Sequence, residues 1–297
     1  GSQDHRINDG SIVSRVELAP RDGIILLRPL DKVTDTPFPN GAFLRIFDGA
    51  GSVTRTGFFA YDNRYRGGET VLVRDLDRDG IKETIVADDS AVRVLGNDGA
   101  IRASFYPFGK QYRGGVALAV GDVLGNGAKQ IITATTRGDA LVKIWNTDGT
   151  PIHAGFYPYT KVFRGGVNVA VGDLDGDGKD EIVTGAGAGG GPQVAVFAGN
   201  GKLIYPRFFA YAKTFRGGVN VAVGDLDGDG KDEIVTGAGA GGGPHVRVFD
   251  RSGVARGKGF FVGNPAARRG VRVLLTDLDG NGKSEILAAT TDVFTAR

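Results

Sequence analysis

The stretch Gly-Asp-Leu-Asp-Gly-Asp-Gly-Lys-Asp-Glu-Ile-Val occupies residues 172–183, and the same letters return at residues 224–235. Related versions occur at residues 75–83 and 277–285, and a version with fewer acids occurs at residues 122–130. The first aspartate of this motif therefore recurs about every fifty residues, a period typical of repeat proteins in which each unit is one supersecondary module.

The residues between two acidic motifs are typical of short β-strands. Apolar and β-branched runs alternate with glycine and asparagine turns, and no run has helical periodicity. In one unit the predicted strands are 167–172 (VNVAVG), 181–185 (EIVTG), 193–197 (QVAVF) and 202–211 (KLIYPRFFAY). Tight hairpin turns are predicted between the third and fourth strands at Asp98-Gly99, Asp148-Gly149 and Asn200-Gly201.

Four antiparallel strands repeated in this way predict an all-β fold, a β-propeller that forms a single domain. The expected blades are 21–61, 66–108, 113–159, 164–211, 216–262 and 268–297. Six blades are expected, or five if residues 24–61 are not a true blade. We expect residues 12–18 to supply the missing strand of the last blade, which would close the ring and remove exposed sheet edges. Gly1-Ser2 resembles a scar from a cleaved expression tag.

The composition excludes several classes of protein. The chain contains no cysteine, which excludes disulfides and thiolate metal or redox chemistry. No apolar stretch approaches the length of a membrane span, so membrane insertion is not expected. The chain contains 50 glycines, and they lie in turns between apolar runs, so they indicate frequent chain reversal.

The acidic motif has the spacing of an oxygen-ligand cation loop. Carboxylates stand at loop positions 1, 3, 5 and 9, the carbonyl of position 7 can join them, and the glycine at position 6 permits the turn. An oxygen-only set favours Ca²⁺ over Mg²⁺ or Zn²⁺. Asp-Gly pairs also form turns without metal, but regular recurrence with a closing Glu favours calcium. The loop is not an EF-hand, because Thr184 stands where that loop needs Glu.

About four structural calcium sites are expected. The first three comprise Asp75, Asp77, Asp79, Ile81 and Glu83; Asp173, Asp175, Asp177, Lys179 and Glu181; and Asp225, Asp227, Asp229, Lys231 and Glu233. A fourth, weaker one comprises Asp277, Asp279, Asn281, Lys283 and Glu285, whereas the loop 122–130 is expected to be empty. Four bound ions would raise the formal charge from +2 to about +10, which favours anionic partners.

These motifs, together with Phe-x-x-Tyr/Phe, Arg-Gly-Gly and Gly-Ala-Gly, resemble the FG-GAP repeat of integrin α-subunit propellers and their bacterial relatives. The resemblance covers almost the whole chain. It implies a calcium-binding propeller, often of seven blades, with metal loops on one face and recognition loops on the opposite face. It does not imply a particular ligand.

Candidate ligand-binding residues come from the segment before each innermost strand. Arginines precede a glycine pair or its equivalent there and could bind carboxylate, sulfate or phosphate groups; alternatively, each arginine packs on aromatic side chains of its own unit. These arginines are Arg66, Arg113, Arg164, Arg216 and Arg268. Trp145 is the only tryptophan, and it either stacks on a sugar or packs in the core, which is the favoured alternative.

The sequence favours a non-catalytic, calcium-binding propeller of a secreted or cell-surface protein, acting in adhesion or in recognition of a glycan, an acidic polysaccharide or a surface protein. A propeller-based polysaccharide lyase or hydrolase is the enzyme alternative, but no unique cluster of catalytic residue types stands outside the repeat. A spacer within a larger surface protein is a further alternative. Nucleic-acid binding is not expected, because the arginines are dispersed. The isolated domain is expected to be a monomer.

Overall fold

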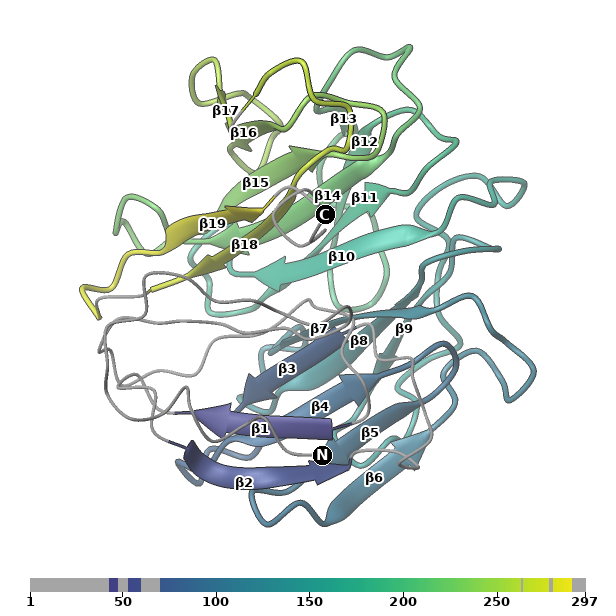
Figure 1. Ribbon diagram of the computed structural model, residues 1–297, viewed down its shortest axis with the longest axis vertical. Coiled ribbons are helices and arrows are strands. Elements are labelled where there is room, and N and C mark those ends of the chain that lie inside the picture. The colour runs from purple at the N-terminus through teal and green to yellow at the C-terminus, as the bar shows by residue number, and fades with distance from the viewer. Residues whose placement is uncertain (1–42, 48–52, 60–69, 263, 278–279, 290–297) are drawn as a thin grey trace, which may run out of the picture.

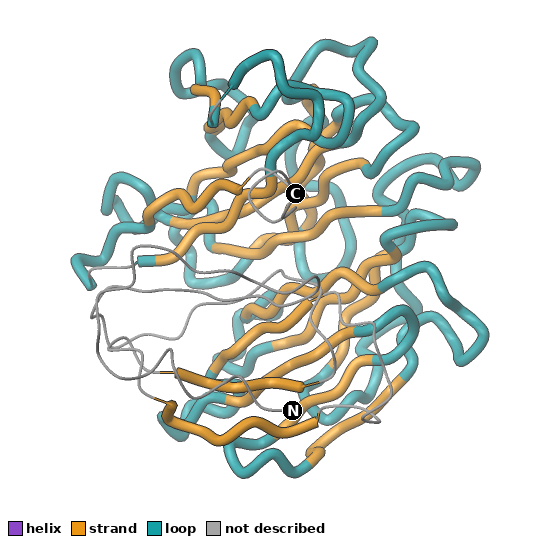
Figure 2. The backbone as a smooth tube through the Cα atoms, viewed as in Figure 1, coloured by secondary structure: helices purple, strands orange, loops and turns teal. Residues whose placement is uncertain are grey.

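The computed structural model describes residues 43–47, 53–59, 70–262, 264–277 and 280–289. Every regular element in these ranges is a β-strand, and they contain no helix that could span a membrane (Figure 2). The strands form six antiparallel sheets, one within each expected blade range. The expected closing strand at 12–18 lies outside the described residues.

The sheets follow one another around the molecule in chain order (Figure 1). The first and last described sheets have two strands each: β1 (Phe43–Phe47) with β2 (Val53–Phe59), and β18 (Arg272–Thr276) with β19 (Glu285–Ala289). The second sheet comprises β3 (Thr70–Arg74), β4 (Glu83–Ala87), β5 (Val92–Leu95) and β6 (Ile101–Phe105), and the third comprises β7 (Val116–Gly121), β8 (Gln130–Thr135) and β9 (Val142–Trp145). The fourth comprises β10 (Val167–Gly172), β11 (Glu181–Ala186), β12 (Gln193–Phe197) and β13 (Phe208–Phe209), and the fifth comprises β14 (Val219–Gly224), β15 (Glu233–Ala238), β16 (His245–Phe249) and β17 (Phe260–Phe261).

The first strands of neighbouring sheets lie next to one another: β3 contacts β7, β7 contacts β10, β10 contacts β14, and β14 contacts β18. Two asparagines join these strands directly. The Asn168 side chain donates to the Val219 carbonyl at 2.8 Å, and Asn220 donates to the Val271 carbonyl at 2.7 Å. The second strands are buried along their whole length, which explains why EIVTGA reads as a continuous run without polar alternation.

The predicted fourth strand at 202–211 is wrong as a continuous element. Only Phe208–Phe209 pair as a strand there, and Leu203 adds an isolated bridge to Phe197. Pro206 stands between these two pairings and has no N–H to donate to a ladder. In the third sheet the fourth strand is reduced to two isolated bridges, one of them at Pro151. The turn before it still forms as predicted, with Gly149 at a φ of 84°.

Aromatic rings of these fourth strands pack the sheets against one another. The ring centroids of Phe105 and Trp145 are 4.8 Å apart, and equivalent pairs join Phe156 to Phe197 at 4.7 Å and Phe208 to Phe249 at 4.8 Å. In each pair the first ring belongs to one sheet and the second ends the third strand of the next sheet. The aromatic residue that follows the first ring is exposed in every case, namely Tyr106, Tyr157 and Phe209.

Candidate metal centre

Each acidic loop is a hairpin loop between the first and second strands of a sheet. Its last residue pairs with the residue before its first aspartate: Glu181 pairs with Gly172, and Glu233 pairs with Gly224. The remaining loops share this register, through Arg74 and Glu83, Gly121 and Gln130, and Thr276 and Glu285. The register brings the position-9 side chain back to the start of the loop.

The first aspartate holds the loop closed. In the loop 173–181 its Oδ1 atom accepts the N–H of Gly176 at 2.7 Å, and its Oδ2 atom accepts the N–H of Gly178 at 2.8 Å. The Glu181 Oε2 atom accepts the N–H of Leu174 at 2.9 Å. The loops 75–83 and 225–233 repeat all three bonds, so one pattern of backbone donors fixes the carboxylates at positions 1 and 9.

Positive φ angles are required at loop positions 4 and 6. Gly176 and Gly178 have φ angles of 80° and 85°. The sequence prediction identified the need for glycine at position 6 and missed position 4. In the loop 75–83 that position is held by Arg78, with a φ of 65°. A non-glycine residue in this region is strained, since its Cβ crowds the backbone.

The structure brings three carboxylates together in each of three loops. The ligand atoms of each group lie within 4.8 Å of one another. The groups are Asp75, Asp77 and Glu83; Asp173, Asp175 and Glu181; and Asp225, Asp227 and Asp229. Of the other predicted carboxylates, Asp79 and Asp177 each accept the N–H of the position-7 residue, Ile81 or Lys179, and Glu233 lies beside Arg256.

Burial makes these groups unfavourable without a counter-charge. Glu83, Glu181 and Glu233 are buried. Burial raises the pKa of Glu181 to about 7, and repulsion from Asp175, Asp173 and Asp177 adds to the effect. Burial raises the pKa of Glu233 as well, partly offset by Arg256. Each loop thus combines a buried glutamate with half-buried or exposed aspartates in an oxygen-only donor set, and such a set fits a hard divalent cation.

The fourth predicted site is described in part. Asp277 accepts the N–H groups of Gly280 at 2.6 Å and Gly282 at 3.1 Å, and Asn281 accepts that of Lys283 at 2.7 Å. These bonds match those of the other acidic loops. The predicted ligand Asp279 lies outside the described residues.

Loops of neighbouring sheets are joined through position 8. Asp180 donates its backbone N–H to the Asp122 carbonyl at 3.0 Å and accepts the Asp122 N–H on its side chain at 2.6 Å. Asp232 donates to the Asp173 carbonyl at 2.8 Å, and Ser284 donates to the Asp225 carbonyl at 2.6 Å. These bonds join the loops 122–130, 173–181, 225–233 and 277–285 in one series along one end of the sheets.

The predicted ligand arginines lie at the opposite end of the sheets, because each precedes the strand that an acidic loop follows. Arg113, Arg164, Arg216 and Arg268 are exposed. In each of them the Nη1 atom donates to two carbonyls of its own loop, for example 2.6 Å from Arg216 to the Lys213 carbonyl. These guanidinium groups are therefore held by hydrogen bonds to backbone carbonyls, and not by the packing on aromatic rings that was the expected alternative. Arg66 lies outside the described residues.

Trp145 is a core residue. Its side chain is 7% exposed, and its Nε1 atom donates to Thr133 Oγ1 at 2.9 Å. The ring packs on Phe105 and is not available for stacking on a sugar. The assignment of Trp145 to a ligand site is therefore wrong, and the favoured alternative of core packing is the one that the structure supports.

Comparison with known proteins identifies the repeat. A family model described as the FG-GAP-like repeat matches residues 173–236, the segment that begins at the first of the two identical loops and extends past the second. This match confirms the resemblance in that segment. No curated protein matches the chain in sequence.

Two solved structures illustrate the similarity in fold. The V. cholerae biofilm matrix protein Bap1 is 18% identical, with a TM-score of 0.48, over 78% of this chain and 34% of that chain, so this chain spans about a third of its length. The WD40 β-propeller domain of Doa1 is 14% identical, with a TM-score of 0.53, over 86% of this chain and 71% of that chain. At this identity the second similarity concerns the fold alone. Together with the sheets, it identifies the fold as a β-propeller, within which residues 173–236 match the FG-GAP-like repeat.

Proposed function

We propose that the chain is a non-catalytic, extracellular β-propeller that calcium stabilises and that recognises an anionic polysaccharide. Calcium binding is supported by one observation: three carboxylates cluster in each of three loops, and these loops have the same strand register. The residues that would hold the ions are the acids at positions 1, 3, 5 and 9, together with the position-7 carbonyl. Bound calcium would supply positive charge to these clustered carboxylates.

An extracellular location follows from the affinity expected of such loops. Extracellular calcium modules bind at about 10⁻⁴–10⁻³ M. At millimolar calcium each site then adds on the order of 1 kcal/mol to the free energy of unfolding. Three or four sites would together supply a sizeable part of the usual 5–15 kcal/mol. In a cytosol with far less calcium the same loops would be mostly empty.

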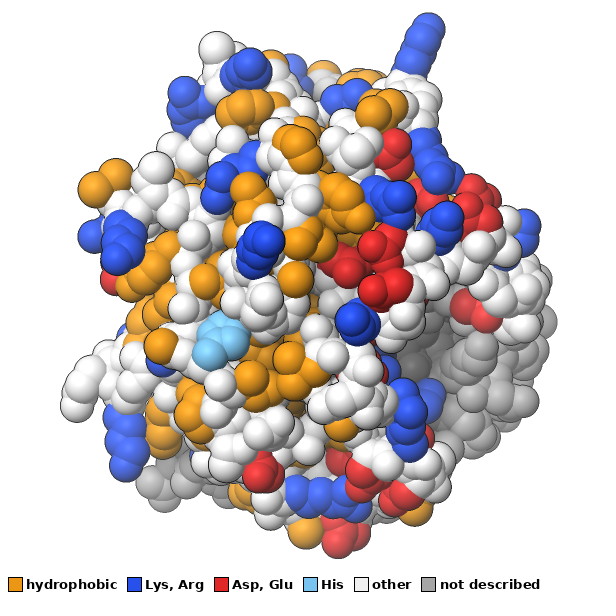
Figure 3. Space-filling model, turned by 180° about the vertical axis from the view of Figure 1, so that it is seen from behind, with side chains coloured by type: hydrophobic (Ala, Val, Ile, Leu, Met, Phe, Trp, Pro, Cys, Tyr) orange, Lys and Arg blue, Asp and Glu red, His pale blue; other side chains and the backbone are white. Residues whose placement is uncertain are grey.

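The polysaccharide part is supported by the loops at the opposite end of the sheets. Three of these loops present an exposed arginine and also an exposed aromatic ring with a lysine ammonium over it: Lys161 Nζ lies 5.3 Å from the Tyr157 centroid, Lys213 Nζ 5.3 Å from that of Phe209, and Lys110 Nζ 5.6 Å from that of Tyr106. Figure 3 shows basic and apolar side chains interspersed over one face of the molecule. Cations recognise acidic groups, and aromatic rings stack on sugar faces.

The calcium part is tested by thermal unfolding of the full chain in chelator, in millimolar Ca²⁺ and in millimolar Mg²⁺. We expect calcium to raise the midpoint by several degrees and magnesium to have a much smaller effect. Equal midpoints in chelator and calcium would overturn it.

The polysaccharide part is tested by surface plasmon resonance on immobilised dextran sulfate, with neutral dextran as reference. The double variant Arg113→Ala/Arg216→Ala should bind at least tenfold more weakly than the wild type. The matched control Lys82→Ala/Lys202→Ala removes the same charge from the opposite end and should bind like the wild type. Equal losses in both variants would indicate a net-charge effect only, and no binding by the wild type would favour the spacer.

A further inference from the structure

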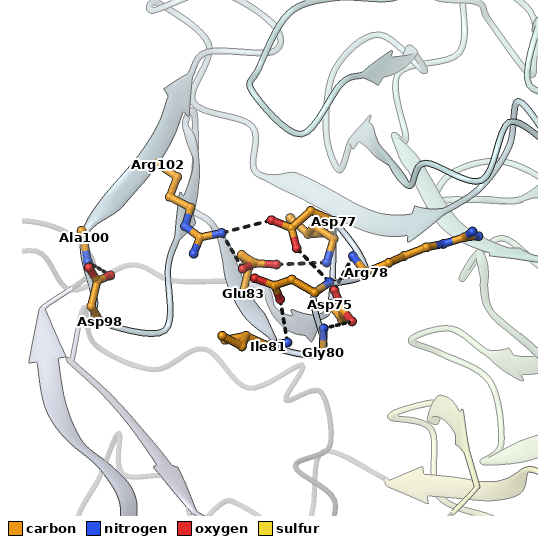
Figure 4. Close-up of polar contacts among 11 residues, drawn as sticks. Asp75, Asp77, Arg78, Gly80, Ile81, Glu83, Asp98, Ala100 and Arg102 are labelled. Atoms are coloured by element: carbon orange, nitrogen blue, oxygen red, sulfur yellow. Dashed lines mark hydrogen bonds and ion pairs between the residues drawn. The ribbon is translucent and has the colours of Figure 1, made fainter.

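In two of the three acidic loops with clustered carboxylates, the carboxylates form ion pairs with an arginine from another part of the same sheet. Arg102, in β6, places Nη1 at 2.6 Å from Glu83 Oε1 and 3.6 Å from Asp77 Oδ2 (Figure 4). Arg256 places Nη1 at 2.6 Å from Asp227 Oδ2 and 2.9 Å from Glu233 Oε1. Both guanidinium groups therefore bridge loop positions 3 and 9.

The two arginines occupy equivalent places in the repeat. Each follows a hairpin glycine by three residues, Gly99 with a φ of 81° and Gly253 with a φ of 83°. The residue before each arginine pairs with the end of the third strand, Ile101 with Leu95 and Ala255 with Phe249. One shared turn thus directs both side chains toward the acidic loop.

The fourth sheet, which carries the loop 173–181, has a different residue at this place. Gly201, with a φ of 78°, makes the same turn, and Leu203 pairs with Phe197, so the equivalent of the arginines is Ile204. Ile204 is 37% exposed and brings no charge to the loop 173–181. The neighbouring Tyr205 hydroxyl donates to Asp175 Oδ2 at 3.5 Å. The three loops therefore share one carboxylate pattern and differ in their internal counter-charge.

A guanidinium at positions 3 and 9 opposes calcium in two ways. It occupies oxygens of two predicted ligands, so these hydrogen bonds must break or rearrange when an ion binds. A positive charge that remains within a few ångströms of the ion also repels it, and the repulsion is stronger at a partly buried site than in water. Without calcium, Arg102 and Arg256 neutralise the buried Glu83 and Glu233, whereas Glu181 forms no ion pair in the part of the chain that the structure describes.

We propose that Arg102 and Arg256 are built-in counter-ions that weaken calcium binding at their own loops, and that the loop 173–181 is the tightest of the three sites. The inference rests on the proposed calcium function. Its consequence is graded occupancy: as calcium falls, the loops 75–83 and 225–233 release their ions first and remain neutralised by arginine, while the loop 173–181 retains its ion.

Isothermal titration of the calcium-free full chain with CaCl₂ tests the two arginine loops. The wild type should show sites of at least two affinities. Arg102→Ala and Arg256→Ala should each tighten one weak site by about tenfold. Arg102→Gln and Arg256→Gln keep a hydrogen-bonding group without the charge and should tighten binding in the same direction. The control Lys202→Ala removes a cation that touches no carboxylate group and should leave the titration unchanged.

A site-specific readout tests the loop 173–181. The Tyr205 ring lies beside Asp175, so energy transfer from Tyr205 would excite terbium bound in this loop. The emission that Tyr205→Phe removes is therefore the emission from this site. Ile204→Arg should weaken terbium binding at this site by about tenfold, whereas Ile204→Gln, of similar length and uncharged, should not.

The outcomes separate this inference from the proposed function. Calcium binding that none of the arginine variants tightens and that Ile204→Arg leaves unchanged would overturn the inference and leave the calcium proposal intact. Complete absence of calcium binding in the wild type would overturn both. Thermal unfolding adds a check. In chelator, Arg102→Ala and Arg256→Ala should each have a lower unfolding midpoint than the wild type, and at high calcium their midpoints should return to the wild-type value.

Discussion

The loops 173–181 and 122–130 have nearly the same backbone and different chemistry. Asp122 accepts the N–H groups of Asn126 at 3.1 Å and Gly127 at 2.6 Å, much as Asp173 does in its own loop. Gln130 Oε1 also accepts a backbone N–H of its loop, that of Leu124 at position 3, at 3.2 Å, whereas Glu181 accepts that of Leu174 at position 2. The loop conformation therefore needs one aspartate and one acceptor at position 9, and it does not need the carboxylates at positions 3 and 5.

The difference lies at the position-7 carbonyl. In the loop 122–130 the Gln130 Nε2 atom donates to the Ala128 carbonyl at 2.7 Å. A side-chain amide therefore binds the carbonyl that is a predicted calcium ligand in the other loops. A glutamate cannot make this bond, because its carboxylate only accepts. The comparison indicates that the loop conformation does not need the surplus carboxylates of the loop 173–181, which supports the proposed cation site.

The largest effect is expected when the missing acids are introduced into the loop 122–130. We expect the triple variant Leu124→Asp/Asn126→Asp/Gln130→Glu to lose on the order of 2–3 kcal/mol of unfolding free energy in chelator, because it buries a carboxylate at position 9, adds two aspartates that repel it and removes the amide. Millimolar calcium should recover much of this loss and add one binding site. Denaturant titration with and without calcium measures both effects, and a loss that calcium does not reverse would contradict the prediction.

The reverse change removes one acid. Glu181→Gln gives the loop 173–181 the position-9 chemistry of Gln130, and its amide can reach the Lys179 carbonyl in the same way. We expect the variant to be about 1 kcal/mol more stable than the wild type in chelator, since a buried charge disappears. In calcium it should be less stable than the wild type and bind one ion fewer. Greater stability in both conditions would contradict a ligand role for Glu181.

The pH dependence of stability should distinguish the loops with a buried acid at position 9 from the loop 122–130. Burial raises the pKa of Glu181 from 4.5 to about 7 and that of Asp232 from 3.8 to about 7. The folded state thus binds these protons more tightly, so in calcium-depleted buffer stability should fall as pH rises from about 4.5 through 7. Gln130 has no proton to lose. Unfolding midpoints across this window should show the fall, and Glu181→Gln and Asp232→Asn should each flatten it.

Local sequence signals were sufficient for much of the fold. The strands 167–172 and 193–197 and the acidic loops follow from β-branched runs and from the register that a closing hairpin imposes, and all of them form as predicted. The fourth strand at 202–211 was wrong because Pro206 removes a ladder donor in the middle of an otherwise suitable run. The sequence itself contains this signal.

Contacts between distant segments could not be predicted in this way. Arg102 and Arg256 reach the carboxylate groups only because the hairpin turn places the start of a fourth strand beside the acidic loop. The burial of Trp145 depends on Phe105 of the preceding sheet. Glycine at loop position 4 recurs in four of the five loops, but Arg78 interrupts the pattern, and the φ angles show that this position is left-handed in all five.

The smallest effect is expected from a substitution of Arg78, at position 4 of the loop 75–83. The equivalent residues Gly125, Gly176, Gly228 and Gly280 all have positive φ, and Arg78 adopts the same region at 65°. Arg78→Gly removes the strain and increases the freedom of the unfolded chain, and these effects partly cancel. We expect a net gain of about 0.5 kcal/mol, present with or without calcium, since the residue shapes the loop and supplies no ligand. Arg78→Ala should not gain, because alanine retains the Cβ. A gain that appears only in calcium would instead assign Arg78 an electrostatic effect on the ion, and denaturant titrations of both variants in calcium and in chelator distinguish the two causes.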